Sequence, residues 1–208
     1  MVNIIHTGDN VEKANKILKV AQKRFGLYGL EKTSMKEIAS DIGISKATLY
    51  YYFPDKEHLF KAVVEMEQES FSEIIETTFE TSDDPAILMR KFVKIRLDYF
   101  KTFFNLSRLR FEDFKTMKPI LNDTYEIFNK KEIDQIKKIL NIGIEKKIFF
   151  IDDVQSIATL FLESLKGIRS LVIHNKELLY VEQEDYDLLE KKQNAFTDVF
   201  IRGLMFKA

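Results

Sequence analysis

The sequence contains no cysteine and no long apolar run. Without cysteine the chain can form no disulfide bond, thiolate nucleophile or zinc site of the cysteine type. No stretch approaches the roughly 18 uninterrupted apolar residues of a membrane span. The opening MVNIIHTGDN also lacks the basic and apolar segments of a signal peptide. We therefore expect a cytoplasmic protein with no membrane partner.

Groups suited to catalysis or metal binding are also scarce. The three histidines, His6, His58 and His174, are too scattered in the sequence to suggest a metal site. No nucleophile and base stand at a spacing that one helix face would bring together. We expect no enzyme activity, no metal and no cofactor.

The charge is nearly balanced, with 32 Lys and Arg against 33 Asp and Glu. Residues 1–60 carry 9 Lys and Arg against 7 Asp and Glu, a net +2, which leaves −3 for the remainder of a chain whose total is −1. Such a weak field does not attract nucleic acid by itself. A DNA-binding interpretation must rest on where individual cations lie.

Helix-breaking residues are few, and apolar residues recur at spacings of three and four along almost the whole chain, with 7 Gly and 3 Pro in total. This pattern predicts an all-α fold of about nine helices. The expected helices cover residues 10–28, 35–43, 45–53, 55–80, 84–104, 106–116, 118–147, 152–174 and 184–206. The stretches KIFFI and LLYVE have a β-like composition, but they are short and flanked by helical patterns, so we interpret them as turns.

Residues 35–53 have the pattern of two short helices around a glycine turn, which is the arrangement of a helix-turn-helix. Ser34 and Glu37 form a capping-box pattern at the start of the first helix, and Gly43 ends it. Ser45 can cap the second helix. A second helix held in this way can enter the major groove of DNA.

That second helix carries three adjacent tyrosines, within ISKATLYYYFPDK. Successive helical side chains turn by about 100°, so three adjacent rings cannot share one buried face. Leu49 and Phe53 form the natural inward pair. The residues expected on the exposed face are Lys46, Ala47, Thr48, Tyr50, Tyr51 and Tyr52. Lysine and threonine at a helix start can read base edges, and tyrosine hydroxyls can donate to phosphates.

Lys56 gives an independent indication of a bound anion. It stands at the first position of the next predicted helix, where the helix dipole disfavours a cation by some tenths of a kcal/mol. A phosphate at this helix start would bind both the free N–H groups and the ammonium group.

From about residue 10 to residue 59 the sequence resembles the TetR family of bacterial transcriptional repressors. The positions that match the family pattern are Ile38, Ala39, Gly43, Ile44, Ser45, Leu49, Tyr50, Tyr52, Phe53 and Lys56. Two positions depart from it, because the family frequently has Gly in place of Ala47 and His in place of Tyr52.

The resemblance implies which residues contact DNA. Phosphate contacts are implied for Tyr50, Tyr52 and Lys56. Base or mixed contacts are implied for Lys36, Lys46, Thr48 and Tyr51. The full predicted DNA-binding set is Lys36, Ser45, Lys46, Ala47, Thr48, Tyr50, Tyr51, Tyr52 and Lys56.

The predicted domains are a helix-turn-helix DNA-binding domain over residues 1–55 and a helical bundle for effector binding and dimerisation over residues 56–208. The fourth helix, 55–80, bridges them. The second domain is rich in phenylalanine, and aromatic-lined clefts between helices are common small-molecule sites. Core packing is the alternative for each ring, whereas the resemblance implies an effector pocket here.

The residues assigned to this pocket are Phe92, Tyr99, Phe103, Phe111, Phe114, Tyr125, Phe128 and Phe161. Polar side chains that could anchor an effector are Tyr99, Arg108, Tyr125, Glu163, Arg169 and His174. We expect the effector to be a small and largely apolar molecule.

The last two predicted helices carry apolar stripes wider than one neighbouring helix would cover. Ser164 and Gly167 would permit close helix contact. The expected use is a four-helix interface between two copies, which resembles how the family dimerises, and burial within one chain is the alternative. The residues assigned to the interface are Ile157, Phe161, Ser164, Ile168, Leu171, Leu189, Phe196, Phe200 and Leu204.

These patterns and the resemblance predict a ligand-responsive transcriptional repressor that binds a near-palindromic operator as a homodimer. The predicted partners are double-stranded DNA, a second copy of the chain and a small effector. An activator, or a regulator without an effector, would share the fold and the DNA contacts. Alternatives of other classes are a helical protein-interaction module that uses the tyrosine face, and a ligand carrier or enzyme that uses the phenylalanine-rich domain.

Overall fold

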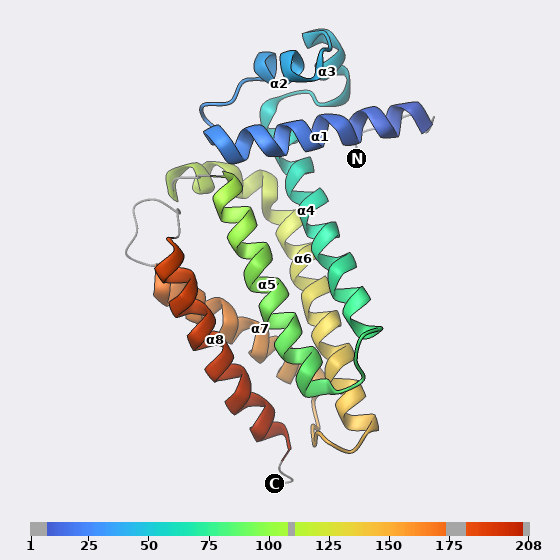
Figure 1. The fold of residues 1–208 in the computed structure, drawn as a ribbon, viewed down its shortest axis with the longest axis vertical. Helices are drawn as coiled ribbons and strands as arrows, with labels where there is room; N and C mark the ends of the chain where they lie inside the picture. Colours follow the sequence, from blue (N-terminus) through green and yellow to red (C-terminus); the bar gives the residue numbers. More distant parts are fainter. Residues whose placement is uncertain (1–7, 108–110, 174–181, 206–208) are drawn as a thin grey trace. The chain divides into compact units, whose positions relative to one another are not determined.

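The computed structural model describes the backbone of residues 8–107, 111–173 and 182–205, and the side chains of residues 9–101, 119–172 and 182–205. Over these ranges the chain forms eight α-helices and no strand (Figure 1). The helices are α1 (Gly8–Tyr28), α2 (Met35–Ile42), α3 (Lys46–Tyr52), α4 (Lys56–Phe79), α5 (Pro85–Ser107), α6 (Phe111–Glu145), α7 (Val154–Ile173) and α8 (Gln183–Leu204). The predicted all-α fold is confirmed. No helix in the described ranges is long and apolar enough to cross a membrane.

The expected number of helices was wrong at one place. The sequence pattern predicted a break near residue 117, but α6 continues through Pro119 as one helix of 35 residues. A proline removes a single backbone hydrogen bond, and the helical pattern on both sides outweighs that loss. KIFFI lies in a turn, as predicted, where the Phe150 N–H donates to the Leu204 carbonyl at 2.8 Å. LLYVE falls almost entirely outside the described residues.

The chain divides into two compact units. In its described part the first unit comprises residues 8–68, 102–107 and 111–124, and the second comprises residues 69–101, 125–173 and 182–205. The boundaries fall inside α4, α5 and α6. The predicted domain boundary at residue 55 lies within the first unit, which continues along α4 to Gln68.

The core of the first unit joins α1, α2 and α3 to the start of α4. The α1 side chains Ile17, Ala21 and Phe25 are buried at helical spacing. The Phe25 ring packs edge-on against Phe60 of α4, with ring centroids 5.4 Å apart. The buried face of α1 thus forms part of the core against which the first unit packs.

The core of the second unit is a single cluster of buried aliphatic and aromatic residues from α4 to α8. One close approach in it requires glycine. The Phe149 ring lies directly against Gly143 of α6, so that a Cβ at this position would come within 2.1 Å of a ring carbon. The Phe149 N–H donates to the Gly143 carbonyl at 3.0 Å, which holds the ring in place.

Candidate nucleic-acid interface

The turn between α2 and α3 is fixed by hydrogen bonds on both sides. The Ser34 hydroxyl accepts from the Glu37 N–H at 3.3 Å, and the Glu37 carboxylate accepts from the Ser34 N–H at 2.9 Å. Gly43 ends α2 with φ +76°, a left-handed conformation that glycine adopts at little cost. The Ser45 hydroxyl accepts from the Thr48 N–H at 3.0 Å. The predicted capping box, glycine turn and serine cap are confirmed, and they set the direction of α3.

Ion pairs join α2 to α1. Arg24 Nε donates to Asp41 Oδ2 at 2.5 Å, and a guanidinium nitrogen lies 3.3 Å from Glu37 Oε1. The hydrogen bond from Arg24 lowers the pKa of the Asp41 carboxyl. The pKa of Glu37 is also lowered, chiefly by its hydrogen bonds with Ser34. These contacts keep the helix-turn-helix seated on α1.

One face of α3 is open to solvent. Lys46, Ala47, Tyr50 and Tyr51 are exposed, and Tyr51 retains 67% of its accessible surface. Lys46 Nζ lies over the Tyr50 ring, 5.4 Å from its centroid, so an ammonium and a phenol occupy neighbouring positions on this face. All three tyrosine rings were expected on the exposed face, and Tyr50 and Tyr51 lie there.

Two further members of the predicted set lie beside this face. Thr48 is partly buried, and its hydroxyl lies 2.8 Å from that of Ser45. Lys36 is exposed on the first turn of α2.

Tyr52 was predicted to be exposed and to contact a phosphate, but the structure contradicts the exposure. Its side chain is only 4% exposed, and its hydroxyl donates to Asn10 Oδ1 of α1 at 3.0 Å. The prediction failed because the last turn of α3 rests on α1, so that Tyr52 joins Leu49 on the inward face. Its ring packs edge-on against Tyr51, with centroids 5.3 Å apart, and thereby supports the exposed phenol.

Lys56 is partly buried and has a partner inside the first unit. Its Nζ donates to the Leu30 carbonyl at 3.0 Å, which ties the start of α4 to the loop after α1. An ammonium has three N–H groups, so donors remain for an anion. The same helix start is capped by Asp55, which accepts from the His58 N–H at 2.7 Å. Burial raises the pKa of Asp55, but the hydrogen bonds from His58 outweigh it and the pKa is lowered.

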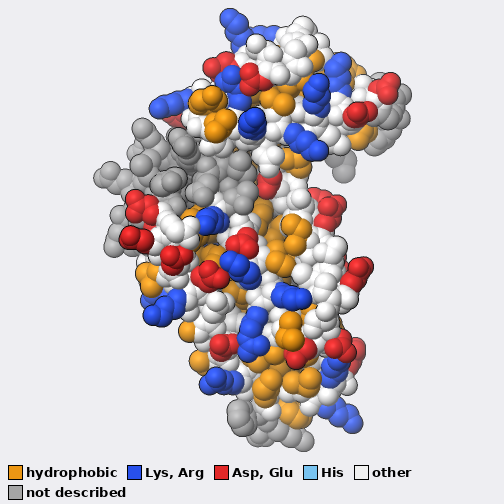
Figure 2. All heavy atoms as spheres, in the orientation of Figure 1, with side chains coloured by type: hydrophobic (Ala, Val, Ile, Leu, Met, Phe, Trp, Pro, Cys, Tyr) orange, Lys and Arg blue, Asp and Glu red, His pale blue; other side chains and the backbone are white. Residues whose placement is uncertain are grey.

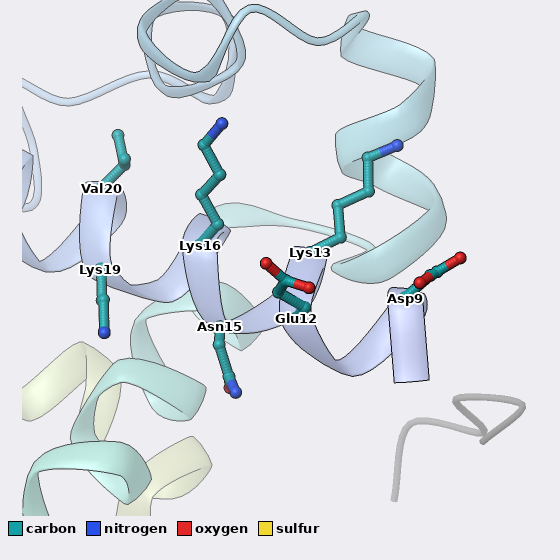
Figure 3. A pocket seen from close by; sticks show the side chains of 7 residues that line it. All are labelled: Asp9, Glu12, Lys13, Asn15, Lys16, Lys19 and Val20. Carbon is teal, nitrogen blue, oxygen red and sulfur yellow. The ribbon is translucent and has the colours of Figure 1, made fainter. Parts of the chain in front are cut away.

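A surface pocket runs along α1 (Figure 3). Its lining residues are Asp9, Glu12, Lys13, Asn15, Lys16, Lys19 and Val20. Figure 3 shows Lys13, Lys16 and Val20 on one side of the helix, and Asn15 and Lys19 on the other. Figure 2 shows more Lys and Arg than acidic side chains on the visible face of the α1–α3 region. These α1 lysines were not among the predicted DNA-binding residues, although their regular spacing of three residues could have indicated them.

The predicted effector residues are mostly core residues where they are described. Phe92, Phe128 and Phe161 are buried in the core cluster, and Tyr99 and Tyr125 are partly buried. The side chains of Phe103, Phe111 and Phe114, and the anchors Arg108 and His174, lie outside the described residues. No group of three or more potential metal ligands occurs among the described residues.

The predicted dimer set divides into two groups. Phe161, Leu189 and Leu204 are buried in the chain's own core, so their assignment to a surface between copies was wrong; the Phe161 ring of α7 lies against the Phe196 and Phe200 rings of α8. The partly buried members are Ile157, Ser164, Ile168, Phe196 and Phe200. Leu171 is 82% exposed.

Comparison with known proteins finds regulatory proteins both among sequence families and among solved structures. Residues 17–63 match the family described as bacterial regulatory proteins, tetR family. The crystal structure of a transcriptional regulator from Cytophaga hutchinsonii is similar over 93% of this chain and 99% of its own, with 38% identity and a TM-score of 0.87.

Two curated relatives match in part. The HTH-type transcriptional regulator SAB2452 of Staphylococcus aureus is 33% identical over 95 residues, which are 46% of this chain and 49% of the relative. The HTH-type transcriptional regulator RutR of Escherichia coli is 28% identical over 111 residues, 53% of this chain and 52% of the relative. The chain thus spans about half the length of these curated relatives.

Proposed function

The chain belongs to the tetR family of bacterial regulatory proteins, and from this premise we propose that it is a transcriptional repressor that binds a near-palindromic operator as a homodimer and releases it when a small effector binds. The observation that carries the proposal is the exposed face of α3. Lys46, Tyr50 and Tyr51 project from a helix whose start is fixed by Ser45 and whose opposite face is buried. The first unit thus presents the hydrogen-bond donors of these three side chains on a helix that is packed on its other face.

The residues of this face have complementary tasks. Lys46 lies in the first turn of α3, where it can donate to guanine O6 or N7, and Ala47 can contact a thymine methyl group. The hydroxyls of Tyr50 and Tyr51 can donate to phosphates. Lys36 adds a cation at the start of α2. Tyr52 has a supporting task, because its hydroxyl is held by Asn10.

Lys56 and the start of α4 form a further phosphate contact in this proposal. Its ammonium group already holds the Leu30 carbonyl, so the side chain is positioned before DNA arrives. Positioning in advance lowers the entropy lost on binding.

A second copy covers an apolar face of α7 and α8. Leu160 and Leu171 of α7 are exposed at a spacing of three helical turns, and Val199 of α8 is 69% exposed. A Cβ added to Gly167 or Gly203 would meet no atom within 4 Å, so another helix can approach there. Adjoining apolar residues around small residues fit helix packing between two copies.

A two-fold dimer places its two α3 helices on successive major grooves, about 34–36 Å apart. An effector weakens operator binding by preferring a dimer in which this spacing is lost. It must bind that state more tightly, since a ligand with equal affinity for both states shifts nothing.

Selection of bound duplexes from a random DNA pool tests the proposal. The expected product is a near-palindrome. In a dimer Lys46→Ala should weaken binding and relax the base preference at one position of each half-site, because a donor to a guanine edge is lost in both copies. Lys130→Ala, at an exposed position of α6, is the matched control. No enrichment of any sequence, or equal DNA affinity and base preference for the two variants, would refute the DNA-binding face.

A further inference from the structure

A buried ion pair lies between α5 and α6 in the second unit. Arg96 Nε donates to Glu132 Oε1 at 2.5 Å, and the two side chains are 7% and 2% exposed. Charged side chains are rarely this buried unless they are paired. Glu132 stands on the same face of α6 as the core residues Phe128 and Ile136, so that the carboxylate is placed inside the bundle.

Two more cations from α7 join this pair. The Arg169 guanidinium lies over the Phe100 ring, 4.6 Å from its centroid. Lys166 Nζ donates to the side-chain oxygen of Asn129 on α6. Both lysine and arginine are partly buried, and both have neutral partners in these contacts. The nearby Glu163 is exposed.

Among the described side chains, Arg96, Lys166 and Arg169 lie near one buried carboxylate, Glu132, while the exposed Glu163 also acts on Lys166. Burial, and then the charge of Arg96, lower the pKa of Arg169 to about 10. Burial likewise lowers the pKa of Lys166, and Glu132 only partly opposes it. Both shifts are in the direction that burial of a cation produces.

Aromatic side chains adjoin the cations. Tyr99 and Tyr125 lie close enough to Arg169 to interact with its charge. The Tyr99 ring is 5.2 Å from Phe71 and 5.4 Å from Phe128, centroid to centroid. Burial raises the pKa of Tyr125 to about 12, so its phenol stays protonated at neutral pH and can act as a donor. Positive charge thus occurs beside the partly buried Tyr99 ring, which packs on the core rings of Phe71 and Phe128.

We propose that the effector of this protein is an organic acid, whose carboxylate is held by Arg169 and Lys166 beside the Arg96–Glu132 pair and whose apolar body contacts the partly buried ring of Tyr99. The inference rests on the proposed function, because it names the chemistry of the effector that the function requires. It also refines the expectation of a largely apolar effector.

The charge balance selects this class of ligand. Among the described side chains neither Arg169 nor Lys166 forms an ion pair, so a carboxylate would supply negative charge beside them, and guanidinium binds a carboxylate through two parallel hydrogen bonds. A neutral ligand would leave the excess of positive charge in place, and a cationic ligand would add to it. Because Arg96 is already ion-paired with Glu132, a bound anion would contact Arg169 and Lys166.

The experiment compares acids with their amides on the full-length protein. The probes are the straight-chain acids from butanoate to dodecanoate, together with 3-phenylpropanoate, each paired with the amide of the same body. Calorimetry measures affinity for the protein without DNA. Release of the selected duplex measures the regulatory effect. Comparing the straight-chain acids with 3-phenylpropanoate shows whether the site prefers an aliphatic or an aromatic body.

At least one acid should bind about tenfold or more tightly than its amide, as expected for a charge-assisted hydrogen bond. Arg169→Gln, and separately Lys166→Gln, should reduce that preference to less than about threefold. Arg90→Gln, which removes an exposed arginine of α5, should retain it. Circular dichroism confirms that each variant is folded.

Two results overturn the inference: no acid exceeds its amide, or both α7 variants keep the wild-type preference. The two proposals fail separately. If an amide releases the duplex and no acid does, the repressor function holds and the anion site is refuted. If acids bind with the stated preference but no duplex is ever selected, the anion site holds and the repressor function is refuted.

Discussion

At the scale of single residues, two adjacent tyrosines have opposite environments. Tyr51 is exposed, whereas Tyr52 is buried with its hydroxyl on Asn10. Tyr52→Phe removes that buried hydrogen bond and should lower the free energy of unfolding of the first unit by about 1 kcal/mol, with little change in DNA affinity. Tyr51→Phe should do the reverse: stability is retained and DNA binding weakens. Urea unfolding measures the stability of both variants, and DNA titration measures their affinity. Equal stability and equal affinity of the two variants would contradict the different roles of Tyr51 and Tyr52.

The glycine at position 143 supports a second prediction. Because a Cβ there would overlap the buried ring of Phe149, Gly143→Ala should destabilise the second unit by about 1–3 kcal/mol. Gly167→Ala is the matched control, since its methyl group enters open space and alanine favours the helix by up to about 1 kcal/mol. Denaturant midpoints compare the two variants. A loss of stability at Gly167 would instead indicate that a second copy packs closely there.

At the scale of helices, the contact between α1 and α2 depends on pH. Arg24 lowers the pKa of Asp41 below its ordinary value of 3.8, so this contact adds stability above that value and loses it as the pH falls through the lowered pKa. Arg24→Met should be less stable than the wild type at neutral pH. The difference should disappear as the pH falls below about 4. Urea unfolding across this range measures it, with Lys19→Met as the control that shows no such trend.

Among the helices, local features were predictable from the sequence and contacts between distant residues were not. Helix caps are local, so the bonds at Ser34, Gly43 and Ser45 follow from residues only a few positions apart. Tyr52 was misplaced because its environment depends on Asn10, 42 positions away, and no periodicity within α3 reports that contact. Periodicity located the stripes of α7 and α8 but not which neighbour covers them, and for this reason Phe161 and Leu189 were assigned to the wrong surface. The charge at Glu132 was missed, although a carboxylate among apolar positions of α6 is the signal that marks it.

At the scale of the whole molecule, the proposed dimer doubles every DNA contact that one α3 helix makes. Each α3 offers few cations, and the weak charge of residues 1–60 gives little long-range attraction. Linking two such units converts the second binding event into an intramolecular one, which raises affinity without a new contact. A palindromic operator and a dimer are therefore parts of one requirement, and loss of the dimer should abolish tight DNA binding even when α3 is intact.

A charge placed on the exposed face of α8 tests this requirement. Val199→Glu should produce a monomer in sedimentation experiments, because an unpaired carboxylate would be buried between two copies. Operator affinity should fall by about a hundredfold or more, as the second reading helix is no longer linked to the first. Ile127→Glu is the matched control: Ile127 is 61% exposed on α6, away from the α7 and α8 stripes, and its variant should remain dimeric and bind DNA normally. If Val199→Glu sediments as a dimer, the interface lies on another face; if it is monomeric yet binds the palindrome with full affinity, two linked reading helices are not required.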